Sequence, residues 1–150
     1  KGLVIEKVDG PNHIKVVEEF GYEMYLHCGA IRKVLLAYQS PSFIEEYVNK
    51  IIEHDHAFPR VDAGDLRDEL KKIRQSGYAI TYGEYVNDAV GIGAPVFNSE
   101  GELAGSIGII APTIRLNSEE LLKVQLEYVQ KFAADLSRDI GYSPLFSSRA

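Results

Sequence analysis

The sequence has little cysteine, no tryptophan and no excess of positive charge. Its single cysteine excludes an internal disulfide framework and fits a reducing compartment. Sixteen basic residues against 22 acidic ones give a net charge of −6, so the chain lacks the cationic surface with which proteins neutralise nucleic-acid phosphates. No apolar run approaches the roughly 20 residues of a membrane span, and no signal-peptide pattern opens the chain. We therefore expect a cytoplasmic domain that contacts neither DNA nor a membrane by itself.

What is present is typical of one globular domain. The 150 residues are 45% hydrophobic and 25% charged, which is enough for an ordinary core without a metal or a disulfide. Two β-prone runs separated by a turn cluster predict an N-terminal hairpin of residues 2–8 and 13–17. Apolar residues at helical spacing then predict helices over residues 29–38 and 41–53, the second capped by Ser40, followed by a loop over 54–63.

The clearest helix signal begins at Asp62 or Asp65 and ends at Gly77. An acidic cap, buried positions at Leu66, Leu70 and Ile73, and a glycine after the last turn all agree. The last helix opens at Asn117 or Ser118 and stops at Gly141, and its spacing favours a helix lying on a sheet over a coiled coil. Its expected buried stripe is Leu122, Leu126, Val129, Ala133, Leu136 and Ile140.

The fold class follows from the order of these segments. Strands are predicted over residues 78–82, 89–97 and 102–110, and a turn-rich segment at 98–101 joins the last two as a hairpin. Strands, helices, strands and a long helix thus follow one another in separate runs. This order indicates an α+β fold with an antiparallel sheet.

Two segments contain residues that could carry chemistry. His54, Asp55 and His56 lack the third and fourth ligands of a zinc site, so we expect no metal and no cofactor. His27 and Cys28 precede a predicted helix start, where backbone amides make thiols more reactive. An acyl-transfer enzyme using Cys28 with His27 or a distant histidine is one alternative, but neighbouring side chains point apart. We expect a packed thiol and no catalytic residue.

Glycines are concentrated in the predicted hairpin of strands, and they have two interpretations. In one, the glycines leave room above the sheet for a ligand, and the helix beginning at Gly29 offers amide donors to an anion. In the other, they accommodate bulky helix side chains such as Leu36. The residues alone favour neither. The four glycines are Gly91, Gly93, Gly105 and Gly108.

Several motifs follow one another in the order of a known family. The segment Leu26-His-Cys-Gly-Ala-Ile-Arg-Lys-Val-Leu-Leu-Ala37 resembles Leu-His-x-x-Ala-x-Gly-Lys-x-x-Leu-Ala of IclR-type transcription regulators. The leucines, arginine and Gly-Tyr-Ala of residues 66–79 are similar to the next family motif. The resemblance continues through Glu84, residues 92–97, Gly101, residues 112–116 and residues 136–141.

The resemblance implies a fold and a function. Residues 1–141 would form the family's carboxy-terminal effector-binding domain, a GAF-like antiparallel sheet flanked by helices, and 142–150 a flexible tail. In the family, a winged helix-turn-helix, a linker helix and a first sensor strand precede this region, so the resemblance implies a slightly truncated sensor without its DNA-binding domain. The implied protein is no enzyme but a homodimeric or tetrameric regulator, which contacts DNA only through the absent domain. A small-molecule carboxylate effector would shift the arrangement of the DNA-binding domains.

The resemblance also implies an effector site at the start of the first helix. There a backbone amide of Ala30 or Ile31 would receive the ligand's carboxylate. Four further positions carry Asp, Cys, Ser and Ser in members that bind small oxo-acids, and here they are Thr81, Gly91, Gly108 and Ile110. Apolar wall positions are Val16, Met24 and Ala89.

These four replacements remove most side-chain hydrogen bonds from the implied site. An unpaired buried polar group costs about 1–3 kcal/mol, so glyoxylate and pyruvate would bind poorly. We expect a larger, more apolar acid, such as an aromatic one. Arg32 stands where the family prefers glycine; it could supply charge to a carboxylate or point to solvent, and we expect it to point to solvent. A dimerisation module whose cavity is filled by side chains is the remaining alternative.

Overall fold

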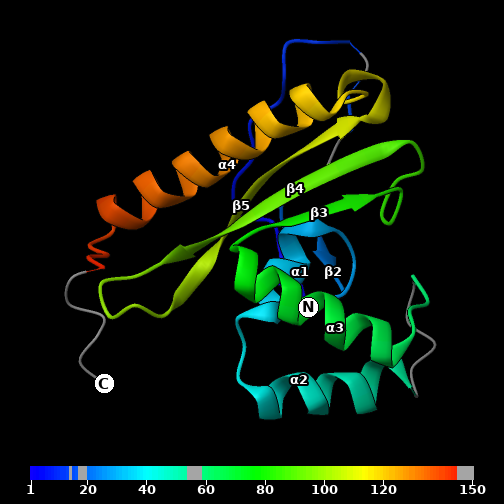
Figure 1. Cartoon of the computed structure of the whole chain (residues 1–150), viewed down its shortest axis with the longest axis vertical. Helices are drawn as coiled ribbons and strands as arrows, with labels where there is room; N and C mark the ends of the chain where they lie inside the picture. The colour runs from blue at the N-terminus through cyan, green and yellow to red at the C-terminus, as the bar shows by residue number, and fades with distance from the viewer. Residues whose placement is uncertain (14, 17–19, 54–58, 145–150) are drawn as a thin grey trace.

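The structure is a computed structural model in which a three-stranded antiparallel sheet has helices on both faces (Figure 1). Helix α4 (Glu119–Asp139) crosses one face, and α1 (Ala30–Ala37) lies against the other. Helix α3 (Ala63–Ser76) packs on α1. These layers confirm the α+β class and the long C-terminal helix on the sheet. The described residues are 1–13, 15–16, 20–53 and 59–144.

The sheet has the order β3 (Ala79–Tyr82), β4 (Ala89–Phe97) and β5 (Leu103–Pro112), with every neighbouring pair antiparallel. All three strands lie where the sequence predicts them. The register places Gly91 opposite Thr81 on one side and opposite Ile110 on the other. Because side chains alternate between the faces of a sheet, these three residues form one row on the face toward α1.

The face toward α4 is a hydrophobic core. Four alternate residues of β4 pack with Val129 and Ala133 of α4, namely Val90, Ile92, Ala94 and Val96. At the end of β4, where the register shifts, the Ser137 hydroxyl accepts a hydrogen bond from the Phe97 amide at 3.0 Å and donates one to the Ala133 carbonyl at 2.7 Å. Ser137 is buried, whereas Leu136 and Ile140 are 41% and 44% exposed. The predicted stripe is therefore wrong at its C-terminal end, where the helical phase turns Ser137 inward.

Helix α3 matches its prediction at both ends. The Asp62 carboxylate accepts hydrogen bonds from the amides of Gly64 and Asp65, and Gly77 ends the helix with a φ of 78°. Its buried residues are Leu66, Leu70 and Ile73, as the spacing predicts.

Helix α2 (Pro41–Tyr47) begins after Ser40, whose hydroxyl accepts a hydrogen bond from the Phe43 amide. It continues as a π-helical turn (Val48–Ile52) to Glu53, which confirms the predicted end. The candidate metal residues His54, Asp55 and His56 lie outside the described residues. No helix in the described part of the chain is long and apolar enough to cross a membrane.

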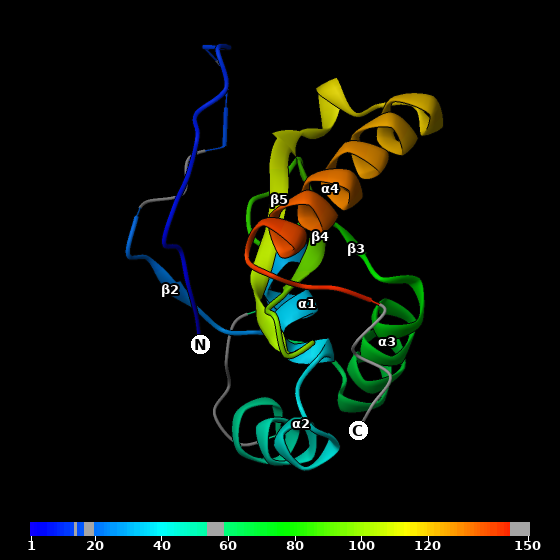
Figure 2. The same cartoon turned by 90° about the vertical axis from the view of Figure 1, so that its left-hand side faces the viewer.

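The N-terminal segment differs from the predicted hairpin. Strand β1 (Gly2–Leu3) pairs with β2 (Glu23–Met24), not with residues 13–17, of which 13, 15 and 16 are described and are not strand. The pairing forms where Gly21, with a φ of 79°, turns the chain back and its amide donates to the Val4 carbonyl. Figure 2 shows this segment standing beside the sheet without joining it.

The predicted flexible tail begins with an ordered turn. The Tyr142 amide donates to the Ser137 carbonyl, and the Tyr142 ring centroid lies 5.4 Å from that of Phe97. Aromatic packing therefore holds the chain through residue 142, which corrects the expectation for this residue. The part of the tail over 145–150 lies outside the described residues.

Candidate functional site

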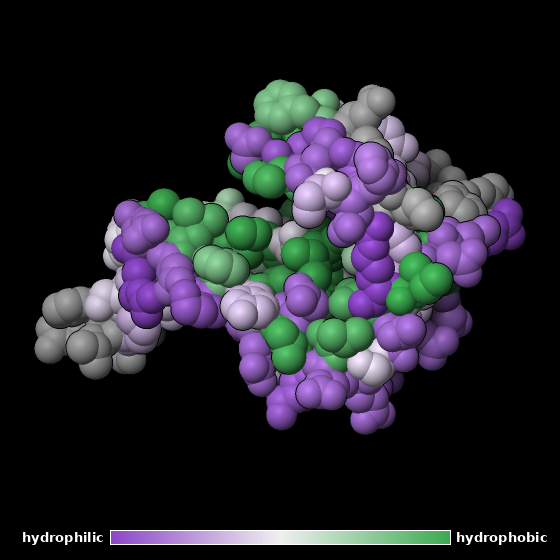
Figure 3. All heavy atoms as spheres, turned by 90° about the horizontal axis from the view of Figure 1, so that it is seen from above, coloured by the Kyte–Doolittle hydropathy of each residue, from purple (hydrophilic) through white to green (hydrophobic). Residues whose placement is uncertain are grey.

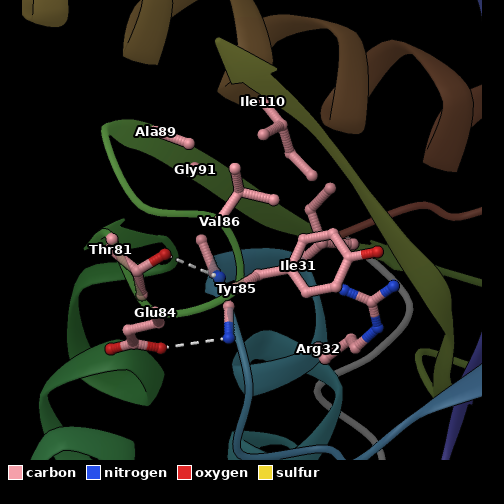
Figure 4. Close-up of a pocket in the computed structure, with 12 residues that line it drawn as sticks. Ile31, Arg32, Thr81, Glu84, Tyr85, Val86, Ala89, Gly91 and Ile110 are labelled. Carbon is pink, nitrogen blue, oxygen red and sulfur yellow. Dashed lines mark hydrogen bonds between the residues drawn. The ribbon is translucent and has the colours of Figure 1, made fainter. Parts of the chain in front are cut away.

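A small pocket lies between the N-terminus of α1 and the sheet (Figure 4). Its floor is the cross-strand row of Thr81, Gly91 and Ile110, and Ala30 and Ile31 form the helix side. The loop between β3 and β4, residues 83–88, closes it from outside. The cavity volume is about 20 Å³, which is close to the space that one water molecule needs. The pocket is therefore nearly filled as it stands.

Two amides at the start of α1 point toward the pocket and are both hydrogen-bonded. The Ala30 amide donates to the Thr81 hydroxyl at 3.0 Å, and the Gly29 amide donates to a carboxylate oxygen of Glu84, also at 3.0 Å (Figure 4). Gly29 has a φ of 80°, a conformation that glycine adopts without strain. The start of α1 thus binds an anion, the carboxylate of Glu84, which the protein itself supplies.

The strand glycines differ in what lies above them. A Cβ atom on Gly93 would lie 2.8 Å from Ile31 Cα, and one on Gly108 would lie 2.6 Å from Ile31 Cγ1, so these glycines let α1 approach the sheet. The residue accommodated is Ile31, and not Leu36. Gly91 lines the pocket instead. Gly105 has open space where its Cβ would be.

The structure brings together most of the residues predicted for the effector site. Those that line the pocket are Ala30, Ile31, Thr81, Ala89, Gly91 and Ile110. Val16 and Gly108 line an adjoining groove of about 540 Å³ between the N-terminal segment and β5, which shares Ile31 and Ile110 with the pocket. Figure 3 shows this groove from above, with hydrophobic residues on its floor. Met24, the remaining predicted residue, lines neither the pocket nor the groove.

Arg32 and the loop residues Tyr85 and Val86 also line the pocket, and sequence reasoning missed them. Arg32 is 4% exposed, and its guanidinium lies 5.5 Å from the Tyr85 ring centroid, so the expectation of a solvent-facing side chain is wrong. A cation over an aromatic ring is attracted by the ring's electron density. The available signal was the turn-rich composition of residues 83–88 between two predicted strands.

A buried ion-pair network supports the helix start. The Lys33 side chain is 2% exposed, and its Nζ lies 2.7 Å from a Glu69 carboxylate oxygen and 2.5 Å from Glu84 Oε1. Lys33 therefore ties the pocket loop to α3. The family motifs contain both Lys33 and Glu84, but nothing in the sequence places them together.

His27 is buried next to the site, in a network that leaves it unable to act on Cys28. Its Nδ1 and the Tyr47 hydroxyl are 2.9 Å apart, and its Nε2 lies 2.9 Å from the Pro59 carbonyl. Since that carbonyl can only accept, Nε2 carries the proton, and the Tyr47 hydroxyl donates to Nδ1 while it accepts from the Leu26 amide. Burial lowers the pKa of His27 and raises the pKa of Tyr47 to about 12.

Cys28 is fully buried, and its Sγ contacts the Glu84 carbonyl at 3.9 Å. With both of its ring nitrogens bonded elsewhere, His27 is not placed to act as a base for Cys28. Among the residues that the structure describes, no group of three His, Cys, Asp or Glu side chains could hold a metal ion.

The pocket lies in a fold shared with known proteins. The model of the family described as bacterial transcriptional regulator IclR C-terminal matches residues 1–138. The chain is 28% identical over 149 residues to the HTH-type transcriptional regulator KipR of Bacillus subtilis, covering 95% of this chain and 57% of KipR. It is 27% identical over 141 residues to KdgR of Dickeya chrysanthemi, covering 93% of this chain and 46% of KdgR.

Solved structures agree with these matches. The Thermotoga maritima IclR structure has a TM-score of 0.82 at 26% identity, covering 94% of this chain and 57% of that one. Pseudomonas aeruginosa HmgR, at 18% identity, shares the fold, with a TM-score of 0.79 over 95% of this chain and 56% of its own. This chain spans about half the length of the relatives it matches. It belongs to the IclR family of transcriptional regulators and corresponds to the family's C-terminal domain.

Proposed function

We propose that this domain binds a small organic acid in the pocket at the start of α1. The observation that supports this most is the position of two helix amides, those of Gly29 and Ala30, across the pocket from the row of Thr81, Gly91 and Ile110 on the sheet. Aligned amides and the helix dipole stabilise a negative charge at a helix N-terminus. Six of the nine residues predicted from the family resemblance line this pocket.

The lining favours an acid with an apolar body. Ile31, Val86, Ala89 and Ile110 give the pocket apolar walls, and the hydroxyl of Thr81 already accepts a hydrogen bond from the protein. An oxo-acid would find few partners for its second oxygen group, whereas an aromatic ring would bury apolar surface at about 25 cal/mol per Å². Because the cavity is only about 20 Å³, such a ligand enters only if the loop carrying Tyr85 and Val86 moves outward.

At the level of the whole protein, we propose that the effector controls DNA binding by shifting a conformational population. A ligand that binds one arrangement of the domain better than another biases the two by its difference in affinity. The winged helix-turn-helix of a longer chain would respond to this bias. We propose the outer side of α4 as the surface for self-association. There Tyr128 and Phe132 are each 52% exposed, and their stacked ring centroids lie 6.3 Å apart.

Thermal unfolding against a panel of carboxylates tests the proposal. Benzoate and phenylacetate are expected to raise the melting temperature, by roughly 5–10 °C at a hundredfold excess over Kd, and glyoxylate and pyruvate to raise it less. Gly91→Val should abolish the shift, because its side chain would fill the pocket floor, and Gly105→Val, at an open position of the same hairpin, should preserve it. The absence of a shift with any carboxylate would favour a purely structural module.

A further inference from the structure

The loop over residues 83–88 is both the cover of the pocket and the source of a charge inside it. It leaves β3 at Gly83, with a φ of 64°, and enters β4 after Asp88, with a φ of 58°. The Gly83 amide donates to the Ala89 carbonyl at 2.8 Å and closes the loop at its base. From this narrow base, Glu84 reaches the helix start while Tyr85 and Val86 cover the cavity (Figure 4).

Glu84 occupies the Gly29 amide, which directly precedes the Ala30 and Ile31 amides expected to receive the ligand's carboxylate. One of its carboxylate oxygens accepts from the Gly29 amide at 3.0 Å, and the other lies 2.5 Å from Lys33 Nζ. Charge-assisted hydrogen bonds of this kind are the strong ones in proteins. A carboxylate ligand that sought the same amide would meet a carboxylate already there.

The surrounding charge makes coexistence of the two anions unfavourable. Lys33 and Arg32 are buried cations at this end of α1; Lys33 is shared between Glu84 and Glu69, and the Arg32 guanidinium lies over the Tyr85 ring. A ligand carboxylate at the Gly29 amide would lie beside the Glu84 carboxylate, and two like charges in contact repel each other. Binding therefore requires Glu84 to leave the Gly29 amide.

We propose that Glu84 is a built-in competitor for the carboxylate of the effector, an inference that rests on the proposed function of the pocket. Effector and Glu84 exchange on one amide, with Lys33 remaining paired to Glu69 throughout. Since Glu84 precedes Tyr85 and Val86 in the same short loop, its release also moves the cover that the ligand must displace. The loop position thereby reports whether the pocket is occupied.

The consequence for affinity is direct. A site that is free for only part of the time binds its ligand more weakly by that fraction. Neutralising the competitor should therefore tighten carboxylate binding. Glu84→Gln keeps the size of the side chain and removes its charge, and Glu69→Gln is the matched control, because it removes the other partner of Lys33 without freeing the amide.

We would follow the Gly29 and Ala30 amide signals by NMR while titrating benzoate and acetate into the wild-type domain and both variants. In Glu84→Gln these amides are expected to respond at concentrations about tenfold lower or more than in the wild type, and in Glu69→Gln at unchanged or higher ones. Glu84→Ala serves as a second variant should Glu84→Gln unfold.

Each other result decides against the proposal in a distinguishable way. Equal midpoints in wild type and Glu84→Gln would leave the effector site standing and remove the competitor. Tighter binding in Glu69→Gln as well would assign the effect to the charge around Lys33 and not to the amide. No response of either amide in any variant would overturn both the competitor and a carboxylate site at this helix end.

Discussion

The two faces of β4 use the same strand for opposite purposes. Toward α4 the strand presents Val90, Ile92 and Val96, which fill a core, whereas toward α1 it presents Gly91 and Gly93, which leave the helix backbone almost touching the sheet. One face gains stability from side-chain volume, and the other depends on its absence. The α4 face is held by apolar packing, whereas the α1 side also depends on the polar contacts of Thr81, Glu84 and Lys33.

The substitution expected to have the largest effect is Gly93→Val, on the face of β4 toward α1. Its Cβ would lie 2.8 Å from Ile31 Cα and 2.9 Å from Ile31 N, and neither backbone atom can move without displacing α1. We expect a loss of more than about 3 kcal/mol in the free energy of unfolding, measured in urea. Gly105→Val, which meets no atom within 4 Å, should change it by less than about 0.5 kcal/mol. Equal effects would show that the two faces do not differ.

A smaller effect is expected at the polar side of the same row. Thr81→Val leaves the buried Ala30 amide without its acceptor, which should lower the free energy of unfolding by about 1–2 kcal/mol. Thr81→Ser keeps the hydroxyl and should recover most of that loss. If valine and serine behave alike in urea unfolding, the hydroxyl contributes only its volume, and the α1 face is less polar in its energetics than its geometry indicates.

Acid provides the smallest of the three perturbations. Burial lowers the pKa of folded His27 below the ordinary value of 6.5, so the folded state binds fewer protons than the unfolded state as pH falls past that value. The free energy of unfolding should therefore decline below about pH 6.5, by at most about 1.4 kcal/mol per pH unit. The difference in unfolding free energy between wild type and His27→Gln, measured from pH 7.5 to 5.5, isolates this contribution. A parallel pH dependence in both proteins would exclude His27 as its source.

Local signals account for what the sequence predicts well. Ser40, Asp62 and Ser118 each cap the helix that follows them, and the turn formers at residues 98–101 join β4 to β5. These signals act within a few residues, so they can be read without knowledge of the fold. Alternation of large and small residues in β4 likewise indicates that its two faces differ.

The remaining features depend on contacts between distant parts of the chain. Glu84 meets Gly29 across 55 positions, and Arg32 becomes buried because Tyr85 covers it. A lone arginine on a helix gives no sign of such a neighbour, and a glutamate in a turn looks like a solvated charge. The pocket could therefore be located from the resemblance, but its occupant and its cover could not.

The hydroxyl of Ser137 links the long helix α4 to the end of strand β4. It is buried, it satisfies the amide of Phe97 and it is tied in turn to the Ala133 carbonyl. Sliding or rolling α4 along the sheet would break this hydrogen bond and cost about 1–3 kcal/mol for the amide left without a partner. The bond therefore opposes any displacement of the C-terminal end of α4 relative to β4, whereas no such side-chain link to the backbone of β4 is needed where apolar residues alone pack.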